Sequence, residues 1–519
     1  MRNVYLLDCT LRDGGYINDF NFGKEIMQGF CSKIVKTGIE MLEVGFLKGD
    51  VNDEDSSLFP DVESFAEIIA PKNEKVKYLG MLDMSNPIPL ERISPYDGTS
   101  IDGIRVIFKK NKIDEAYEYC KHIQELGYFI SVNFVGTDQY SDEEFIAGIN
   151  RFNQLNPFAM SIVDSFGLIK RKQFLHLCQL ADANMAPDIV LAYHAHNNLQ
   201  QAFGNAEALV EKQLERDLII DACVFGMGRG AGNLNLELFA EYMNENYGTS
   251  YDVGPMLEIM DEYLTDIYKK KQWGYSLPFY LSASKHCHPN YAVYMENKDT
   301  LNVQDFDLLL DSISEEDKAF FSKDKAEKYY QSYLCKPFDD AAQLDKLKAA
   351  LNGKTILMIA PGNSIVKYKQ QIQEKTEVVR IAVNFMPVGY NVDYVFSNNM
   401  KRFRKIKTDS TTKTIVTSNV DADSDYKVSF EHFAVENGNL VDNSGVMLLR
   451  LLRGLGAKKV IIAGMDGYEE SYSVSYYDQE LEHKFAMDAK ARNQAIKAEI
   501  DKIKEELDIE FMTPSIYQL

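Results

Sequence analysis

The sequence predicts an α/β protein in which a closed barrel of parallel strands is followed by a smaller, doubly wound parallel sheet. Apolar runs rich in β-branched residues alternate with longer stretches of helical period. Polar residues recur near the C-terminal ends of these runs. The length of 519 residues exceeds that of one ordinary domain. We therefore expect a barrel at 1–285, a helical extension at 286–350 and a second α/β domain at 351–519.

Eight apolar runs in the first part of the chain are expected to form the barrel strands. They start about 25 to 40 residues apart, which leaves room for one helix between consecutive strands. The runs are 4–8, 41–46, 75–83, 103–108, 128–136, 159–165, 189–196 and 218–226. This pattern predicts a (β/α)8 TIM barrel.

Polar side chains near the ends of these runs indicate an active site at one mouth of the barrel. A polar group that is buried without a partner destabilises the fold, whereas a TIM barrel gathers its functional residues at the C-terminal ends of its strands. Five residues are expected at the substrate. Glu43, Asp83 and Asp164 either bind substrate hydroxyls or hold Arg12 and Arg105 in place, and Arg105 and Asn133 are expected to bind substrate.

Two histidines in the seventh run, His194 and His196, indicate a metal site. Residues i and i+2 of a strand face the same side, so both imidazoles should project into the barrel mouth. Asp13 follows the first run, which lies near the seventh in a closed barrel. Two histidines and one carboxylate leave positions open for a substrate, although two hydrogen-bonded core histidines would give the same pattern. We expect Mn²⁺, and the ligands also suit Mg²⁺, Zn²⁺, Co²⁺ or Fe²⁺.

Three segments together resemble one enzyme superfamily. They are LLDCTLRDGGY at 6–16, HAHNN at 194–198 and GMGRGAGNLNLE at 226–237. They are similar to the pyruvate-type aldolases and the acyl-CoA lyases and synthases, which include 4-hydroxy-2-oxovalerate aldolase, 3-hydroxy-3-methylglutaryl-CoA lyase and 2-isopropylmalate synthase. The similarity covers roughly residues 1–295 and is greatest to the hydroxy-oxovalerate aldolases.

The resemblance implies a divalent-metal-dependent aldolase or lyase that acts on a 2-oxo acid through a pyruvate-type enolate. By position it makes Asp13, His194 and His196 the metal ligands. Asn233 becomes a further ligand or a neighbour of the ligands, and Arg12 the group that stabilises the enolate.

The proton-transfer residues depart from the pattern of those aldolases. The hydroxy-oxovalerate aldolases carry a histidine four residues after the motif arginine, whereas this chain has Tyr16 at that position. A tyrosine with a pKa near 10 is a poor base at neutral pH. The segment YLSASKH resembles their tyrosine-bearing helix, so Tyr280 is either a proton donor beside His286 or a packing residue. We interpret His288, which is expected at the start of a helix, as structural.

The second α/β domain is expected to begin near Gly353, where GKTILMIAPGNSIVKYKQQI indicates a strand, a glycine turn and a helix. Further strands are expected in VVRIAVNF, DYVFSNN, KTIVTSN and KKVIIAGMD, with a surface helix at 489–509. The domain loosely resembles the Rossmann-like domain of bacterial sialyltransferases. That resemblance implies a nucleotide or nucleotide-sugar pocket lined by Gly362, Asn363, Ser364, Asn384, Ser444, Gly445 and Asp466.

Composition limits the classes of binding partner and the cellular compartment that are expected. A formal charge of -22 disfavours nucleic acid and anionic membranes. No apolar run is long enough to cross a membrane, and the start lacks the features of a signal peptide, so a cytoplasmic protein is expected. The seven cysteines contain no CxxC pair, which is typical of reduced thiols. A homo-oligomer or a partner enzyme that packs on the extension is consistent with the sequence.

Four functions compete at this point. The leading one is a metal-dependent aldolase joined to a nucleotide-sugar-type domain, with synthesis of a surface polysaccharide as the context by fold analogy. A condensing enzyme of the same superfamily would use an acyl-CoA. Two histidines and a carboxylate also form the metal site of iron(II) oxygenases. A non-catalytic scaffold that binds a metabolite would explain the tyrosine at position 16.

Overall fold

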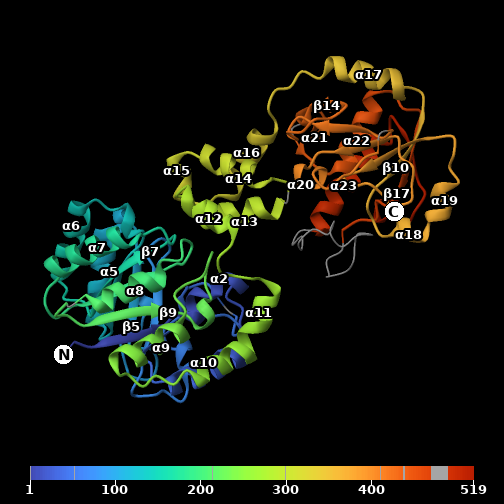
Figure 1. Ribbon diagram of the computed structural model, residues 1–519. Helices are drawn as coiled ribbons and strands as arrows, with labels where there is room; N and C mark the ends of the chain where they lie inside the picture. Colours follow the sequence, from blue (N-terminus) through green and yellow to red (C-terminus); the bar gives the residue numbers. More distant parts are fainter. Residues whose placement is uncertain are drawn as a thin grey trace. The chain divides into compact units, whose positions relative to one another are not determined.

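The computed structural model divides into two compact units, Met1–Asn290 and Tyr291–Leu519 (Figure 1). The residues it describes are 2–51, 53–212, 214–298, 300–409, 411–436, 439–468 and 489–518.

Eight parallel strands close the barrel of the first unit. They are β1 (Val4–Asp8), β2 (Met41–Leu47), β4 (Lys77–Asp83), β5 (Gly103–Phe108), β6 (Phe129–Phe134), β7 (Ala159–Asp164), β8 (Val190–Ala195) and β9 (Leu218–Ala222). The barrel closes because β1 pairs in parallel with both β9 and β2. The TIM barrel is confirmed, and each of the eight predicted runs contains one strand. A two-residue strand, β3 (Leu58–Phe59), pairs in parallel with the last two residues of β2.

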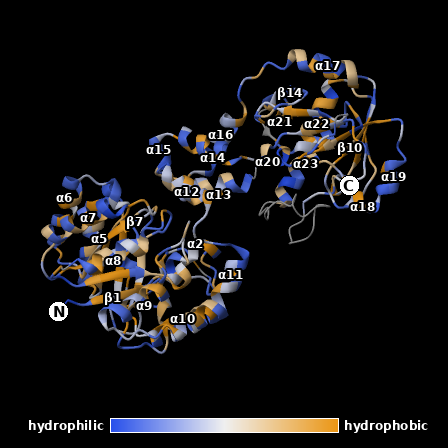
Figure 2. Ribbon diagram, in the orientation of Figure 1, coloured by the Kyte–Doolittle hydropathy of each residue, from blue (hydrophilic) through white to orange (hydrophobic). Residues whose placement is uncertain are grey.

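Helices surround the strands. They are α1 (Thr10–Asp13), α2 (Gly15–Asn18), α3 (Lys24–Ile34), α4 (Ser64–Ile69), α5 (Ile113–Glu125), α6 (Asp142–Asn153), α7 (Arg171–Asn184), α8 (Ala202–Glu211), α9 (Leu236–Tyr247), α10 (Gly254–Ile259), α11 (Thr265–Lys270) and α12 (Leu277–Ser284). Strands such as β1 and β7 are mainly hydrophobic in Figure 2, and most of their apolar side chains are buried. Local sequence sets the helix starts: Ser141 accepts a hydrogen bond from the backbone N–H of Glu144, which forms a capping box for α6.

Five further helices precede the second sheet. They are α13 (Pro289–Lys298), α14 (Val303–Ser312), α15 (Glu315–Lys318), α16 (Lys323–Leu334) and α17 (Ala341–Leu351). His286 and His288 lie in the turn before α13 rather than inside a helix. Among the described helices, none combines the length and the apolar character that crossing a membrane requires.

The second unit contains a seven-stranded parallel sheet in the order β14-β13-β12-β11-β10-β17-β18. Its strands are β10 (Thr355–Ile359), β11 (Val379–Val383), β12 (Tyr394–Ser397), β13 (Lys413–Thr417), β14 (Tyr426–Val428), β17 (Lys459–Ala463) and β18 (Asp508–Phe511). A hairpin of β15 (Val435–Glu436) and β16 (Asn439–Leu440) lies outside the sheet. The helices are α18 (Ser364–Lys367), α19 (Lys369–Gln373), α20 (Met400–Phe403), α21 (Phe430–Ala434), α22 (Ser444–Gly454) and α23 (Ala489–Ile503).

The five strands predicted for this part are present in the seven-stranded sheet, and its other two strands were not predicted. The additional strands, β14 and β18, form the two edges of the sheet. Both are short and carry polar residues, so they lack the apolar run that marks an inner strand. The closing helix is also shorter than predicted: it ends at Ile503, and the residues from Asp508 belong to β18.

Candidate active site

The first strand positions Arg12 and Asp13 through a single turn of helix. Strand β1 ends at Asp8, whose carboxylate accepts hydrogen bonds from the backbone N–H and the hydroxyl of Thr10. The chain then turns into α1, and both Arg12 and Asp13 are buried at the mouth of the barrel. Burial raises the pKa of Asp8 to about 7, although the hydrogen bonds from Thr10 oppose the shift.

Asp13, His194 and His196 converge on one point. The Oδ2 atom of Asp13 lies 3.3 Å from Nε2 of His194 and 3.9 Å from Nε2 of His196. Ligand atoms that each lie about 2.1 Å from an octahedral ion are separated by about 3 Å, so this spacing suits a divalent cation. The two imidazole rings stand at 88° to each other, with centroids 5.4 Å apart. The three predicted ligands therefore form a compact group.

Asn233 lies next to this group in the fold. It forms an isolated bridge with His196, and its Nδ2 donates to Cys223 Sγ and to the carbonyl oxygen of Met227. The Oδ1 atom of Asn233 is buried and has no hydrogen-bond partner among the described residues. A buried acceptor without a donor is destabilising, and a cation would satisfy it.

The pKa values of the three ligands fit a cation site. Burial would raise the pKa of Asp13, but Arg12 and the two histidines outweigh it and hold that pKa well below its usual range. Burial lowers the pKa of His196 to about 3, so its imidazole is neutral and able to coordinate. Burial opposes protonation of His194 as well, but hydrogen bonds to Asp13 and Asp221 outweigh it and raise the pKa.

Six side chains of alternating charge form a closed ring at the mouth, which we call the charge ring. In order around the ring they are Asp13, Arg12, Glu43, Arg105, Asp221 and His194. The five contacts between successive members measure 2.5, 2.6, 3.3, 2.5 and 3.1 Å in that order. A contact of 3.3 Å from His194 to Asp13 closes the ring. All six are buried. Each carboxylate lies between two cationic groups, which offsets the cost of burying it.

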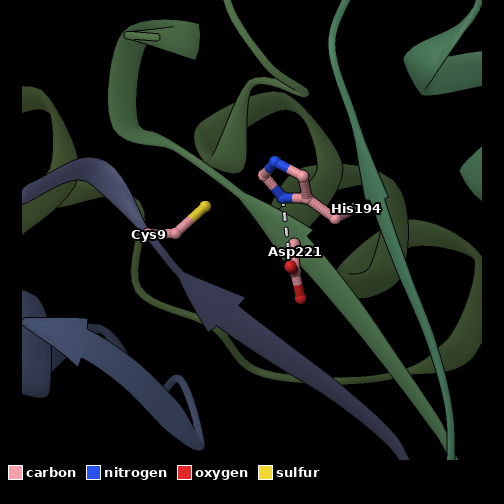
Figure 3. Close-up of side chains that lie close together, drawn as sticks. All are labelled: Cys9, His194 and Asp221. Carbon is pink, nitrogen blue, oxygen red and sulfur yellow. Dashed lines mark ion pairs between the residues drawn. The ribbon is translucent and has the colours of Figure 1, made fainter. Parts of the chain in front are cut away.

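A second group of ligand-type side chains shares His194. Figure 3 shows the imidazole of His194 beside Cys9 and Asp221, with its Nδ1 atom 3.1 Å from Asp221 Oδ2. Asp221 is already paired with Arg105, and burial raises the pKa of the Cys9 thiol well above its usual range. We therefore interpret Asp221 as the residue that orients His194 toward Asp13, in the way that carboxylates orient ligating histidines.

The five residues expected at the substrate differ from one another in their contacts. Glu43 and Arg105 belong to the charge ring. Asn133 is buried and accepts hydrogen bonds from the hydroxyls of Ser131 and Ser161. Asp164 accepts backbone N–H groups of its own loop, and burial raises its pKa to about 7. Asp83 accepts the backbone N–H of Ser85 and is partly exposed. Each of the five thus has a structural partner.

The two candidate proton-transfer tyrosines have no described hydrogen bond to the proposed metal ligands, although Tyr16 is close enough to interact electrostatically with Asp13 and Arg229. Desolvation raises the pKa of Tyr16, which makes it a weaker source of phenolate. Its ring packs edge-on against Phe20 and Phe46. Tyr280 lies on α12, is 42% exposed and has no described contact with the metal ligands.

Two charged residues of the site were not predicted. Asp221 stands between Ile220 and Ala222 in β9, and an acidic residue inside an apolar strand was the available signal. Arg229 lies in the loop after β9, and its backbone N–H donates to Asp13 Oδ1 over 3.3 Å. The sequence places Arg229 in a glycine-rich segment, and no pattern there predicts where its side chain points.

Gly228 provides a local test of this geometry. A Cβ atom at position 228 would lie 2.2 Å from Asn233 Nδ2 and 2.9 Å from Asp13 Oδ1. We expect Gly228→Ala to weaken divalent-metal binding about 10- to 100-fold by displacing these groups. Isothermal titration calorimetry with Mn²⁺ would measure the effect. Gly204→Ala, where the nearest atom is the flexible end of Arg171 at 3.3 Å, is the control and should bind like the wild type. Equal affinities in both variants would contradict the arrangement.

The second unit contains a cavity of about 290 Å³ at the C-terminal ends of its strands. Five of the predicted ligand-binding residues line it, namely Gly362, Asn384, Ser444, Gly445 and Asp466. Asn363 and Ser364 are not among the lining residues; Ser364 instead donates to Asp466 through its backbone N–H and its hydroxyl. Lys298, Arg402 and Arg492 bring positive charge to the lining.

Comparisons with known proteins agree with the barrel. The HMGL-like family matches residues 3–261. The 4-hydroxy-2-oxovalerate aldolase of Desulfitobacterium hafniense is 25% identical over 51% of this chain and 78% of its own length. The oxaloacetate decarboxylase of Mycobacterium tuberculosis is 22% identical over 46% of this chain and 68% of its own length. Among solved structures, the N-terminal domain of an aldolase candidate from Bacteroides vulgatus is 26% identical, covering 56% of this chain and 95% of that domain, with a TM-score of 0.48.

Proposed function

Because the chain belongs, through its barrel, to the HMGL-like family, we propose that it is a divalent-metal-dependent aldolase that cleaves or forms the carbon–carbon bond of a 4-hydroxy-2-oxo acid. The convergence of Asp13, His194 and His196 carries this proposal. Relatives named for aldol cleavage and for oxaloacetate decarboxylation both support a 2-oxo acid as the substrate.

The metal ligands would be Asp13, His194 and His196, with Asn233 Oδ1 beside them. A divalent cation held there supplies a Lewis acid that polarises the 2-oxo group. We favour Mn²⁺, because mixed nitrogen and oxygen ligands with open positions suit it.

Arg12 is proposed to stabilise the charge that develops on the substrate oxygen. Its Nε atom is held by Glu43 at 2.6 Å and its Nη1 atom by Asp13 at 2.5 Å, so the guanidinium has a fixed orientation. Its Nη2 atom is buried without a described partner and can donate a hydrogen bond to the enolate oxygen. A positioned donor of this kind favours the transition state because it needs no reorganisation during the reaction.

The proposal is tested by pyruvate release from a panel of 4-hydroxy-2-oxo acids. The full-length protein is stripped with a chelator and reloaded with Mn²⁺, Mg²⁺, Co²⁺ or Zn²⁺ in parallel. We expect pyruvate only after reloading, with Mn²⁺ giving the highest rate. Bound metal without pyruvate from any member of the panel would contradict aldol chemistry and favour carboxyl transfer or acyl-CoA condensation.

A second function is proposed for the cavity of the second unit, namely binding of a nucleotide or nucleotide sugar. The strand order changes direction at β10, since β11 lies on one side and β17 on the other, and such a switch point is where open parallel sheets bind ligands. The cavity lies against the loops that follow these strands.

Arg402 provides the test of this second function. Its side chain is buried at the cavity, so we expect Arg402→Ala to weaken binding of nucleoside phosphates about 10-fold or more through loss of a charge-assisted hydrogen bond. Calorimetry with CMP, UMP and their diphosphates measures it. Arg404→Ala, an exposed arginine two residues away, should bind like the wild type. Absence of binding by the wild-type protein would contradict a nucleotide site.

A further inference from the structure

Arg229 reaches across the barrel mouth from one strand end to another. It lies in the loop after β9, and its backbone N–H donates to Asp13 Oδ1. Its Nη2 atom donates to the carbonyl oxygen of Ser165, at the end of β7, over 3.1 Å. The backbone of Arg229 thus touches a proposed metal ligand while its guanidinium lies at a different part of the mouth.

The charge of Arg229 has no counter-ion in the described part of the chain. Arg12 and Arg105 each pair with two carboxylates, whereas no described carboxylate forms an ion pair with Arg229. Its Nε atom is buried and lacks a hydrogen-bond partner. The carboxylates of the charge ring do not neutralise the charge of Arg229, because these three carboxylates already face two guanidinium groups and His194. A cation at the metal site would add further positive charge.

The surroundings hold the guanidinium in place without neutralising it. The ring of Tyr16 lies 5.4 Å from the guanidinium carbon, a cation–π distance. A partly buried guanidinium that has no counter-ion among the described residues is stabilised when an anion binds it.

We propose that Arg229 binds a second anionic group of the substrate, carried at the end remote from the 2-oxo acid group. This inference rests on the proposed function, since it takes the 2-oxo acid end to lie at Asp13, His194 and His196. The described contact of the guanidinium is with the carbonyl oxygen of Ser165 at the end of β7, whereas only the backbone N–H of Arg229 contacts Asp13, so the anion is expected to lie to one side of the proposed metal ligands. The favoured substrates are therefore 2-oxo acids whose tails end in a carboxylate or a phosphate, both of which match the planar fork of arginine.

Tyr16 acquires a positioning role in this arrangement. Its aromatic face, rather than its hydroxyl, contacts Arg229. Tyr16→Phe keeps that face and should preserve the preference for anionic tails, whereas Tyr16→Ala should weaken it.

Equilibrium binding tests the proposal independently of turnover. The ligands are 2-oxopentanoate and 2-oxoglutarate, which have the same number of carbon atoms and differ in whether the tail is a methyl group or a carboxylate. With Mn²⁺-loaded full-length protein, we expect calorimetry to show about 10- to 100-fold tighter binding of 2-oxoglutarate. Arg229→Ala should bring the two affinities together, and Arg229→Lys should keep part of the difference. A third ligand, 2-oxo-4-phosphonobutanoate, shows whether a phosphate-type tail binds more tightly than a carboxylate.

Arg171→Ala is the matched control. Like Arg229, Arg171 donates from Nη2 to a backbone carbonyl, that of Gly204 at 2.7 Å, but its side chain is 48% exposed on the outside of the barrel. This variant should keep the preference of the wild type. The same preference in Arg229→Ala as in the wild type, or no preference in the wild type, would overturn the inference. If the preference for 2-oxoglutarate depends on Arg229 but no substrate releases pyruvate, the result would contradict the aldolase proposal and leave the anion site at Arg229 supported.

Discussion

Replacing His194 by alanine is expected to lower pyruvate release by roughly 1,000-fold or more, because several kcal/mol of transition-state stabilisation depend on the cation and each 1.4 kcal/mol is tenfold in rate. His194 is buried between Asp13 and Asp221 and contacts both, so no neighbouring side chain can take its place. The rate is measured with saturating Mn²⁺ and the best substrate of the panel.

His176→Ala is the control for this variant. His176 lies on α7, pairs with Asp142 at the surface and is 51% exposed, so its loss should leave the rate within a factor of two or so, as for an exposed ion pair worth about 0 to 1 kcal/mol. Pyruvate release by His194→Ala at a rate close to that of the wild type would show that His194 is a structural residue.

Replacing Asp221 by asparagine is expected to destabilise the barrel by about 3 to 5 kcal/mol, since breaking a buried ion pair leaves a charge without a partner. Asp221 lies between Arg105 and His194 in the charge ring, and its side chain is fully buried. Asparagine has nearly the same shape, so the effect reports the missing charge and not a cavity. The variant should also bind metal more weakly, because His194 loses the group that orients it.

Urea unfolding followed by tryptophan fluorescence measures this effect in the intact chain. Trp273 is the only tryptophan and is buried in the first unit, so its signal reports the barrel. Asp114→Ala is the control, because Asp114 pairs with Arg151 at the surface and is 88% exposed, and it should change stability by less than about 1 kcal/mol. Unfolding curves that coincide for Asp221→Asn and the wild type would contradict a stabilising ring.

The barrel could be predicted from the sequence because strand periodicity is a local property. The runs at 4–8 and 103–108, for example, coincide with β1 and β5. Alternation along β8 likewise placed His194 and His196 on one face. The edge strands β14 and β18 were missed because short, partly polar strands depend on a neighbour for their stability.

Most partners of the charged residues could not be predicted, because they depend on distances across the barrel. Glu43 holds Arg12 and Arg105, which was one of the two roles expected for it. Arg105 was expected to bind substrate and instead has buried ion pairs within the charge ring. Arg229 received no role from the sequence, since only the structure shows that its guanidinium contacts a backbone carbonyl and forms no ion pair within the described ranges. Residues that form ion pairs within the charge ring therefore stabilise the site, whereas a charged residue without such a pair is available to bind a ligand.

The metal content of the full-length protein, purified without chelator, is the most direct test of the proposed site. Elemental analysis of the wild type and of Asp13→Ala should give one divalent ion per chain in the wild type and none in the variant, because Asp13 is the only carboxylate of the ligand group. A wild-type protein that binds no divalent ion even after addition of Mn²⁺, or an Asp13→Ala variant that retains one ion per chain, would contradict a metal site at Asp13, His194 and His196.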